Sequence, residues 1–251
     1  MDSPTLLLVV ALGAIVAGFV QGLSGFAFGL VAMSIWAWVL DPKLAAVLST
    51  FGALTGQVIA AVTVRRAFDK ALLLPFLIGG LLGVPLGVWL LPRLDVVLFK
   101  VCLGGLLMVW APTMLLSRNL PVIRFGGRLA DGLIGCIGGV CSGIGGFAGA
   151  IPTLWCTLQR LEKNVQRAVI QNFNLAMLAV AFAVQTTSGL VTFEMLPFLG
   201  IVAIAVLVPV LLGARLYVGI SEAAFRQIVL GLLIFAGVAL LASSVPLLLR
   251  R

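Results

Sequence analysis

The chain contains no histidine and few acidic residues. Aspartate and glutamate together number eight among 251 residues. Ser-His-Asp triads, histidine-ligated zinc sites and paired catalytic carboxylates all need residue types that this sequence lacks or holds only in predicted loops. We therefore expect a protein that is not an enzyme and uses no metal and no cofactor. Transport, anchoring and assembly are the classes of function that this leaves.

Charge of either sign is scarce. Charged residues make up 10% of the chain, against about a quarter in an ordinary soluble domain. Hydrophobic residues make up 62%, and the mean hydropathy is +1.26. This composition predicts an integral membrane protein, surrounded by lipid.

Basic residues outnumber acidic residues by 16 to 8. They form no long basic run, so we expect contact with anionic lipid headgroups and no binding of nucleic acid. The four cysteines lie in apolar surroundings without a CxxC spacing. A disulfide framework or a thiolate metal site is therefore not expected.

Six segments are typical of helices that cross the membrane. Two of them, residues 71–91 and 195–214, contain no polar side chain and can each span about 30 Å of hydrocarbon. The other four are residues 44–64, 101–116, 168–187 and 228–249. These six segments predict six complete crossings.

Two further uncharged stretches, residues 5–40 and 132–159, do not fit simple crossings. One helix over the first would be about 54 Å long, far more than a bilayer requires. Glycine-rich segments at residues 21–27 and 141–148 interrupt the two stretches near their middles. We expect each stretch to form a hairpin of two half-helices, about 15 residues each or fewer, that meet inside the membrane.

The two broken stretches belong to a repeat. Gly22 corresponds to Gly143 at an offset of 121 residues, and the offset grows slowly along the chain until Phe99 pairs with Phe225. The sequence LPFL occurs at residues 74–77 and again at 196–199. We therefore divide the chain into a first membrane repeat at 1–117, a cytoplasmic linker at 118–128 and a second membrane repeat at 129–251.

The basic residues favour opposite orientations for the two halves. If each hairpin returns to its own side, most of the 16 basic residues share one side, namely Arg65, Arg66, Lys70, Arg118, Arg124, Arg128, Arg160, Lys163, Arg167, Arg215 and Arg226. If each hairpin crosses once, the basic residues divide evenly. The positive-inside rule therefore predicts an all-α polytopic membrane protein with two inverted-topology repeats, each a broken glycine-rich hairpin plus three transmembrane helices.

The duplicated motifs resemble those of a known family. GLSGF at residues 22–26 precedes DPK at 41–43 and AVLST at 46–50, and GIGGFA at 143–148 precedes Pro152 and RAVIQN at 167–172. Over nearly the whole chain, this pattern resembles the sulfite exporter TauE/SafE family, also called the toluene sulfonate uptake permeases. The resemblance implies a multi-pass protein of the bacterial inner membrane that carries small anions such as sulfite or organosulfonates. Gln171 and Asn172 stand where the family commonly has a Thr-Ser pair.

The two glycine-rich segments are the first candidates for a substrate site. Half-helix ends within the membrane present backbone N–H groups and partial positive charge, which suits an anion, and glycine permits close approach. Close packing of helices through glycine is the alternative. The candidate residues here are Gln21, Gly22, Ser24, Gly25, Phe26, Ser142, Gly143, Gly145, Gly146 and Phe147.

Polar residues near the start of the helix after each hairpin complete the candidate site. They are Thr50 and Gln57 in the first half, and Gln171 and Asn172 in the second, with Ser49 and Asn174 beside them. Such groups must find partners or water within a membrane. We expect donors from Thr50, Gln171 and Asn172 to bind the anion's oxygens, although hydrogen bonds between helices would explain them equally.

The remaining side chains carry weaker expectations. Phe26 and Phe147 either gate the site or pack in the core, and Arg167 either attracts an anion or extends to the headgroups. All five tryptophans lie toward predicted helix ends and are expected to anchor the protein at the membrane interface.

The favoured function is secondary transport by alternating access around the two hairpins. Export is the direction that the resemblance implies. A membrane subunit or anchor that transports nothing, and an anion channel, are the alternatives. A homodimer is possible because glycine-rich helices can pack closely.

Overall fold

A computed structural model of the protein describes residues 3–63, 70–117, 122–123, 126–216 and 222–249. This part of the chain is helical and contains no strand. Seven of its helices are long and apolar enough to cross a membrane. The prediction of an all-α, multi-pass membrane protein is therefore confirmed.

Each half of the chain contributes five α-helices in the same order. The first half contains α1 (Ser3–Ser24), α2 (Phe28–Trp36), α3 (Pro42–Thr63), α4 (Lys70–Leu90) and α5 (Val96–Leu116), with the 3-10 helix η1 (Leu91–Arg93) before α5. The second half contains α6 (Gly127–Gly145), α7 (Ala150–Leu158), α8 (Lys163–Thr187), α9 (Leu196–Leu216) and α10 (Glu222–Leu249), with η3 (Phe193–Met195) before α9.

A glycine in the left-handed conformation ends the first helix of each hairpin. Gly25 has a φ of 83° and Gly146 a φ of 73°, angles that other residues rarely adopt. The N–H of each donates to the carbonyl four residues earlier, on Gln21 at 2.7 Å and on Ser142 at 2.9 Å. The predicted breaks therefore occur at corresponding glycines.

The hairpins are less even than the sequence predicted. α1 has 22 residues and α6 has 19, whereas α2 and α7 have nine each. The expectation of pieces of about 15 residues or fewer is wrong for α1 and α6. Both helices begin before the uncharged stretches do. α1 by itself is long and apolar enough to be one of the seven candidate spans, where six crossings were expected.

Helices of one half pack mainly against helices of the other. α1 lies along α9, α4 lies along α6, and α5 lies along α10. In the repeat, α1 corresponds to α6 and α4 to α9, so the first two pairs are equivalent. A Cβ atom at Gly22 would lie 2.2 Å from the carbonyl oxygen of Val210, and one at Gly143 would lie 2.6 Å from that of Val84. Glycine thus allows the two equivalent contacts between backbones.

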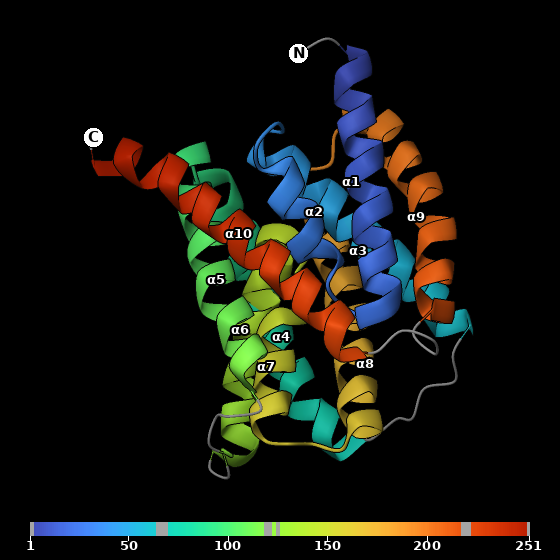
Figure 1. Ribbon diagram of the computed structural model, residues 1–251, viewed down its shortest axis with the longest axis vertical. Helices are drawn as coiled ribbons and strands as arrows, with labels where there is room; N and C mark the ends of the chain where they lie inside the picture. The colour runs from blue at the N-terminus through green and yellow to red at the C-terminus, as the bar shows by residue number, and fades with distance from the viewer. Residues whose placement is uncertain (1–2, 64–69, 118–121, 124–125, 217–221, 250–251) are drawn as a thin grey trace.

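Figure 1 shows the direction of the two hairpins. α1 runs downward from the N-terminus, whereas α6 runs upward from the lower end of the molecule, and both helices end toward the middle. The chain then turns back at each point into α2 or α7. Both termini lie in the upper half of the view.

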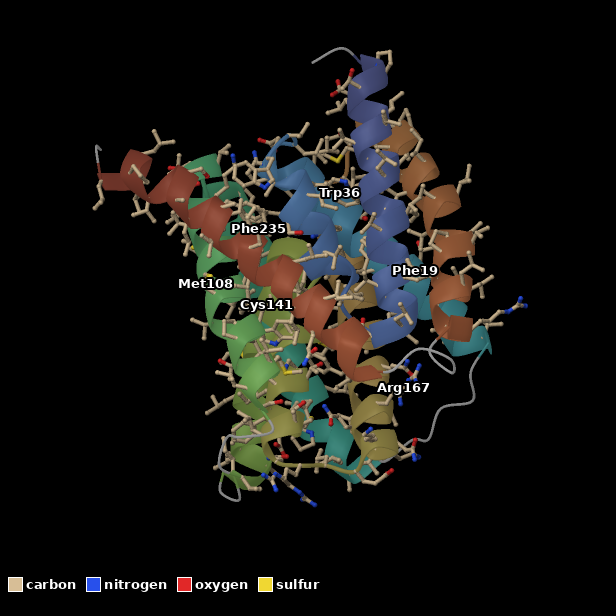
Figure 2. The ribbon with its side chains drawn as sticks, viewed as in Figure 1. Phe19, Trp36, Met108, Cys141, Arg167 and Phe235 are labelled. Carbon is tan, nitrogen blue, oxygen red and sulfur yellow. The ribbon has the colours of Figure 1, made fainter. Side chains whose placement is uncertain are left out.

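Large apolar side chains also cover the outside of the bundle. Leu82 of α4, Ile204 of α9 and Phe235 of α10 are all more than 60% exposed. Water would disfavour such a surface, but lipid solvates it readily. Figure 2 shows Phe235 on α10, which lies across the front of the molecule.

The tryptophans do not all anchor the protein at its surface. Trp36 and Trp110 are buried, and their indole N–H groups donate to the carbonyl oxygens of Val9 at 3.3 Å and Ala150 at 2.6 Å. The interfacial interpretation is wrong for these two, because each ring fills the core and its N–H pairs with a backbone carbonyl. Trp38 and Trp89 are exposed, as an interfacial position requires.

Candidate functional site

A small cavity lies beside residues 21–26, which we call the first tip. Its volume is about 20 Å³, enough for a water-sized molecule. It lies among α1, α3, α8 and α9 and is lined by Gln21, Gly22, Gly25, Gly56, Gln57, Ile59, Ala60, Arg167, Gln171, Val210, Leu211 and Ala214. Polar groups from both halves of the chain therefore meet at this point.

Two glutamines hold the first tip in place. Gln21 Nε2 donates to the carbonyl of Ala53 at 2.8 Å, and Gln57 Nε2 donates to the carbonyl of Gly25 at 2.5 Å. Both side chains are buried, so these hydrogen bonds fix α1 and its turn against α3. Because an amide nitrogen carries two hydrogens, Gln21 retains a second N–H that can serve a ligand.

α8 supplies the other polar wall of the cavity. Gln171 Nε2 would lie 3.1 Å from a Cβ atom at Gly25, so its amide reaches the first tip. Arg167 stands one helical turn earlier and also lines the cavity. Figure 2 shows Arg167 in the lower half of the molecule. Within the described ranges of the chain, it is the one charged residue that lines the cavity, and none of the lining residues is acidic.

Residues 142–147, which we call the second tip, have different surroundings. Ser49 Oγ donates to the carbonyl of Gly145 at 2.6 Å. Gln185 Nε2 lies 3.2 Å from both Thr50 Oγ1 and the carbonyl oxygen of Gly143. All three side chains are buried, so this tip is closed by hydrogen bonds to α3 and α8.

The structure divides the candidate residues between these two regions. Those that line the cavity are Gln21, Gly22, Gly25, Gln57 and Gln171. Those at or against the second tip are Thr50, Ser142, Gly143, Gly145, Gly146 and Phe147. Ser24, Phe26 and Asn172 lie nearby, but none of the three is a lining residue of the cavity.

Several polar groups matter more than the sequence indicated. Gln185 was not among the candidates, although a glutamine inside a membrane helix is itself a signal. Asn174 is 1% exposed, and neither atom of its amide has a hydrogen-bond partner. Asp131, near the start of α6, is buried and accepts a hydrogen bond from Trp155 Nε1 at 2.8 Å.

Each half helps to hold the tip of the other half. Ser49 and Gln171 correspond in the repeat, at an offset of 122 residues. Ser49 contacts the second tip at Gly145, whereas Gln171 contacts the first tip at Gly25. The polar N-terminal part of α3 thus contacts the hairpin of the second half, and that of α8 contacts the hairpin of the first half.

The family described as sulfite exporter TauE/SafE matches residues 10–240, which is nearly the whole chain. The chain belongs to this family. Family membership and the apolar helices together describe a membrane protein of transporter type. No curated protein and no solved structure matches the chain.

Proposed function

We propose that the protein is a secondary transporter, acting as an exporter, of small sulfur-containing anions such as sulfite or organosulfonates across the bacterial inner membrane. One observation carries this proposal: among the lining residues of the cavity that the structure describes, Arg167 is the only charged one and none is acidic. The family description supports sulfite as the first substrate to test.

The cavity offers the chemistry that a small anion needs. Arg167 supplies a positive charge, and Gln21 and Gln171 supply amide groups. α2 begins just after the first tip, so the positive end of its dipole lies close to the bound anion. In surroundings of low dielectric these donors bind an anion more strongly than they would in water.

The arrangement of the halves supports alternating access. The opposite directions of α1 and α6, together with the equivalent pairs α1–α9 and α4–α6, favour inverted repeats around a central site. The positive-inside rule then assigns the lower end of Figure 1 to the cytoplasm. Arg167 lies in the lower half of Figure 2, so an anion from the cytoplasm meets this residue first, and the helices must move apart before the water-sized cavity can hold it.

Transport of sulfite into proteoliposomes tests this function. Arg167→Gln should lower the initial rate at subsaturating sulfite by about tenfold, equivalent to about 1.4 kcal/mol of binding free energy. Gln171→Leu should have a similar effect because it removes an amide from the cavity wall. Arg93→Gln is the matched control, since Arg93 is exposed, lies over the ring of Trp89 and does not line the cavity.

The kinetics separate this proposal from its alternatives. A carrier gives a rate that saturates with sulfite concentration, whereas a channel gives a flux that rises without saturation. An absence of flux from folded wild-type protein would favour the non-transporting subunit. Equal rates for wild type and Arg167→Gln would remove the cavity from the transport path.

A further inference from the structure

The first tip is capped by its own side chain. Ser24 Oγ accepts hydrogen bonds from the backbone N–H groups of Phe26 at 3.3 Å and Ala27 at 3.1 Å. These two donors follow the left-handed Gly25 and point into the turn between α1 and α2. The serine oxygen therefore satisfies the exposed donors of the first turn.

The second tip lacks this cap. Gly145 stands where the first half has Ser24, and Phe147 and Ala148 correspond to Phe26 and Ala27. Within the described part of the chain, the N–H groups of Phe147 and Ala148 have no acceptor. Both residues are at most 5% exposed. Buried backbone donors are nearly always paired, so two unpaired neighbours mark a place for an acceptor.

The ring of Phe147 occupies the place that the serine side chain fills in the first tip. A Cβ atom at Gly145 would lie 2.3 Å from Phe147 Cε1. The corresponding Phe26 is turned elsewhere and packs edge-on against Trp110, with ring centroids 5.9 Å apart. The same residue type thus covers the second tip but leaves the first tip uncovered.

An unpaired amide of α8 lies against the start of α7, directly after the second tip. Asn174 is almost fully buried, and neither its Nδ2 nor its Oδ1 has a partner. Its Nδ2 would lie 2.6 Å from a Cβ atom at Gly149, the residue that caps the nine-residue α7. In the first half the equivalent contact is apolar and formed by Phe28 against Gly52. The polar group is therefore specific to the second hairpin.

We propose that the second tip is a latent binding site for a small oxyanion, which the ring of Phe147 covers in this conformation. When the ring turns away, an oxygen of the anion takes the position equivalent to Ser24 Oγ and accepts from the N–H groups of Phe147 and Ala148. Asn174 donates to a second oxygen. This inference rests on the proposed anion transport and adds a second binding position to it.

The test compares sulfite binding to purified variants in detergent, measured by titration calorimetry. Phe147→Ala should bind sulfite at least fivefold more tightly than wild type, or at one additional site, because the donors are uncovered. Phe26→Ala is the matched control and should bind as wild type does, because Ser24 still caps the first tip. Gly145→Ser added to Phe147→Ala should abolish the gain, because the new hydroxyl then occupies the site.

Two results would overturn the inference: unchanged binding by Phe147→Ala, or a gain that persists in the Gly145→Ser double variant. Phe147→Val provides a smaller change if the alanine variant does not fold, and the same criteria apply to it. Wild-type transport of sulfite is scored separately. If wild type transports sulfite but Phe147→Ala binds sulfite no more tightly, only the second site is refuted. If Phe147→Ala binds more tightly but wild type does not transport, the second site is supported and the transport function is refuted.

Discussion

Gly25 has a left-handed backbone conformation and also lies against Gln171 in the wall of the cavity. Its φ of 83° disfavours any side chain, and a Cβ atom there would lie 3.1 Å from Gln171 Nε2. We expect Gly25→Ala to lower stability by about 1–2 kcal/mol, the penalty of the left-handed conformation, and to reduce sulfite transport by displacing the Gln171 amide. Thermal unfolding and proteoliposome uptake measure the two effects.

Gly189 offers a matched control for this substitution. Its φ is 73°, but nothing lies within 4 Å of a Cβ atom at its position. Gly189→Ala should therefore lose similar stability while transport is retained. If both variants transport equally well, the position of Gln171 at the first tip does not matter for function.

At the scale of residues, the sequence indicated which side chains belong to the candidate site better than it indicated which groups those side chains contact. The glycines of both tips and the glutamines at positions 21, 57 and 171 stood out because polar groups are rare in apolar segments. Gln185 did not, since nothing in one sequence shows that the far end of α8 reaches Gly143. Nor does it show that Phe26 and Phe147 adopt different positions.

At the scale of elements, the close contact between α4 and α6 depends on glycine residues, which have no side chain. A Cβ atom at Gly83 would lie 2.0 Å from the carbonyl oxygen of Cys136, a backbone atom that cannot move aside alone. Gly83→Ala should therefore destabilise the protein by about 3 kcal/mol or prevent its folding, as overpacking does. The yield of monodisperse protein and its unfolding temperature measure this effect.

Gly105, inside α5, is the control for that contact. No atom lies within 4 Å of a Cβ atom at this position, so Gly105→Ala should be neutral or stabilise the helix by up to about 1 kcal/mol. Equal stability of the two alanine variants would show that α4 and α6 do not pack as closely as described.

The hairpins illustrate what can be predicted about elements. The breaks were predictable because glycine clusters interrupt stretches too long for one crossing. The lengths of α1 and α6 were not predictable, because a helix continues past the edge of an uncharged stretch wherever its backbone can form further intrahelical hydrogen bonds. α6 begins at Gly127, before Arg128 and Asp131, so charge did not mark its start.

At the scale of the whole molecule, the inverted layout makes a prediction about sidedness. Arg160, between α7 and α8, should face the cytoplasm, and Glu194, between α8 and α9, should face the opposite side. In a background without native cysteines, Glu194→Cys should react with a membrane-impermeant maleimide in intact cells. Arg160→Cys should react only after the membrane is permeabilised. Labelling of both in intact cells would contradict this layout.

The exchange of helices between the halves has a consequence for biogenesis. The chain is synthesised from α1 onward, but α9, the main neighbour of α1, begins only at residue 196. The face of α1 that carries Gly18 and Gly22 packs against α9. This face must therefore remain in contact with lipid or an insertion factor until most of the polypeptide has been made. Neither half can bury the helix faces that pack against the other half, so each half should be unstable when expressed alone. Expression of the two halves together should restore a stable protein.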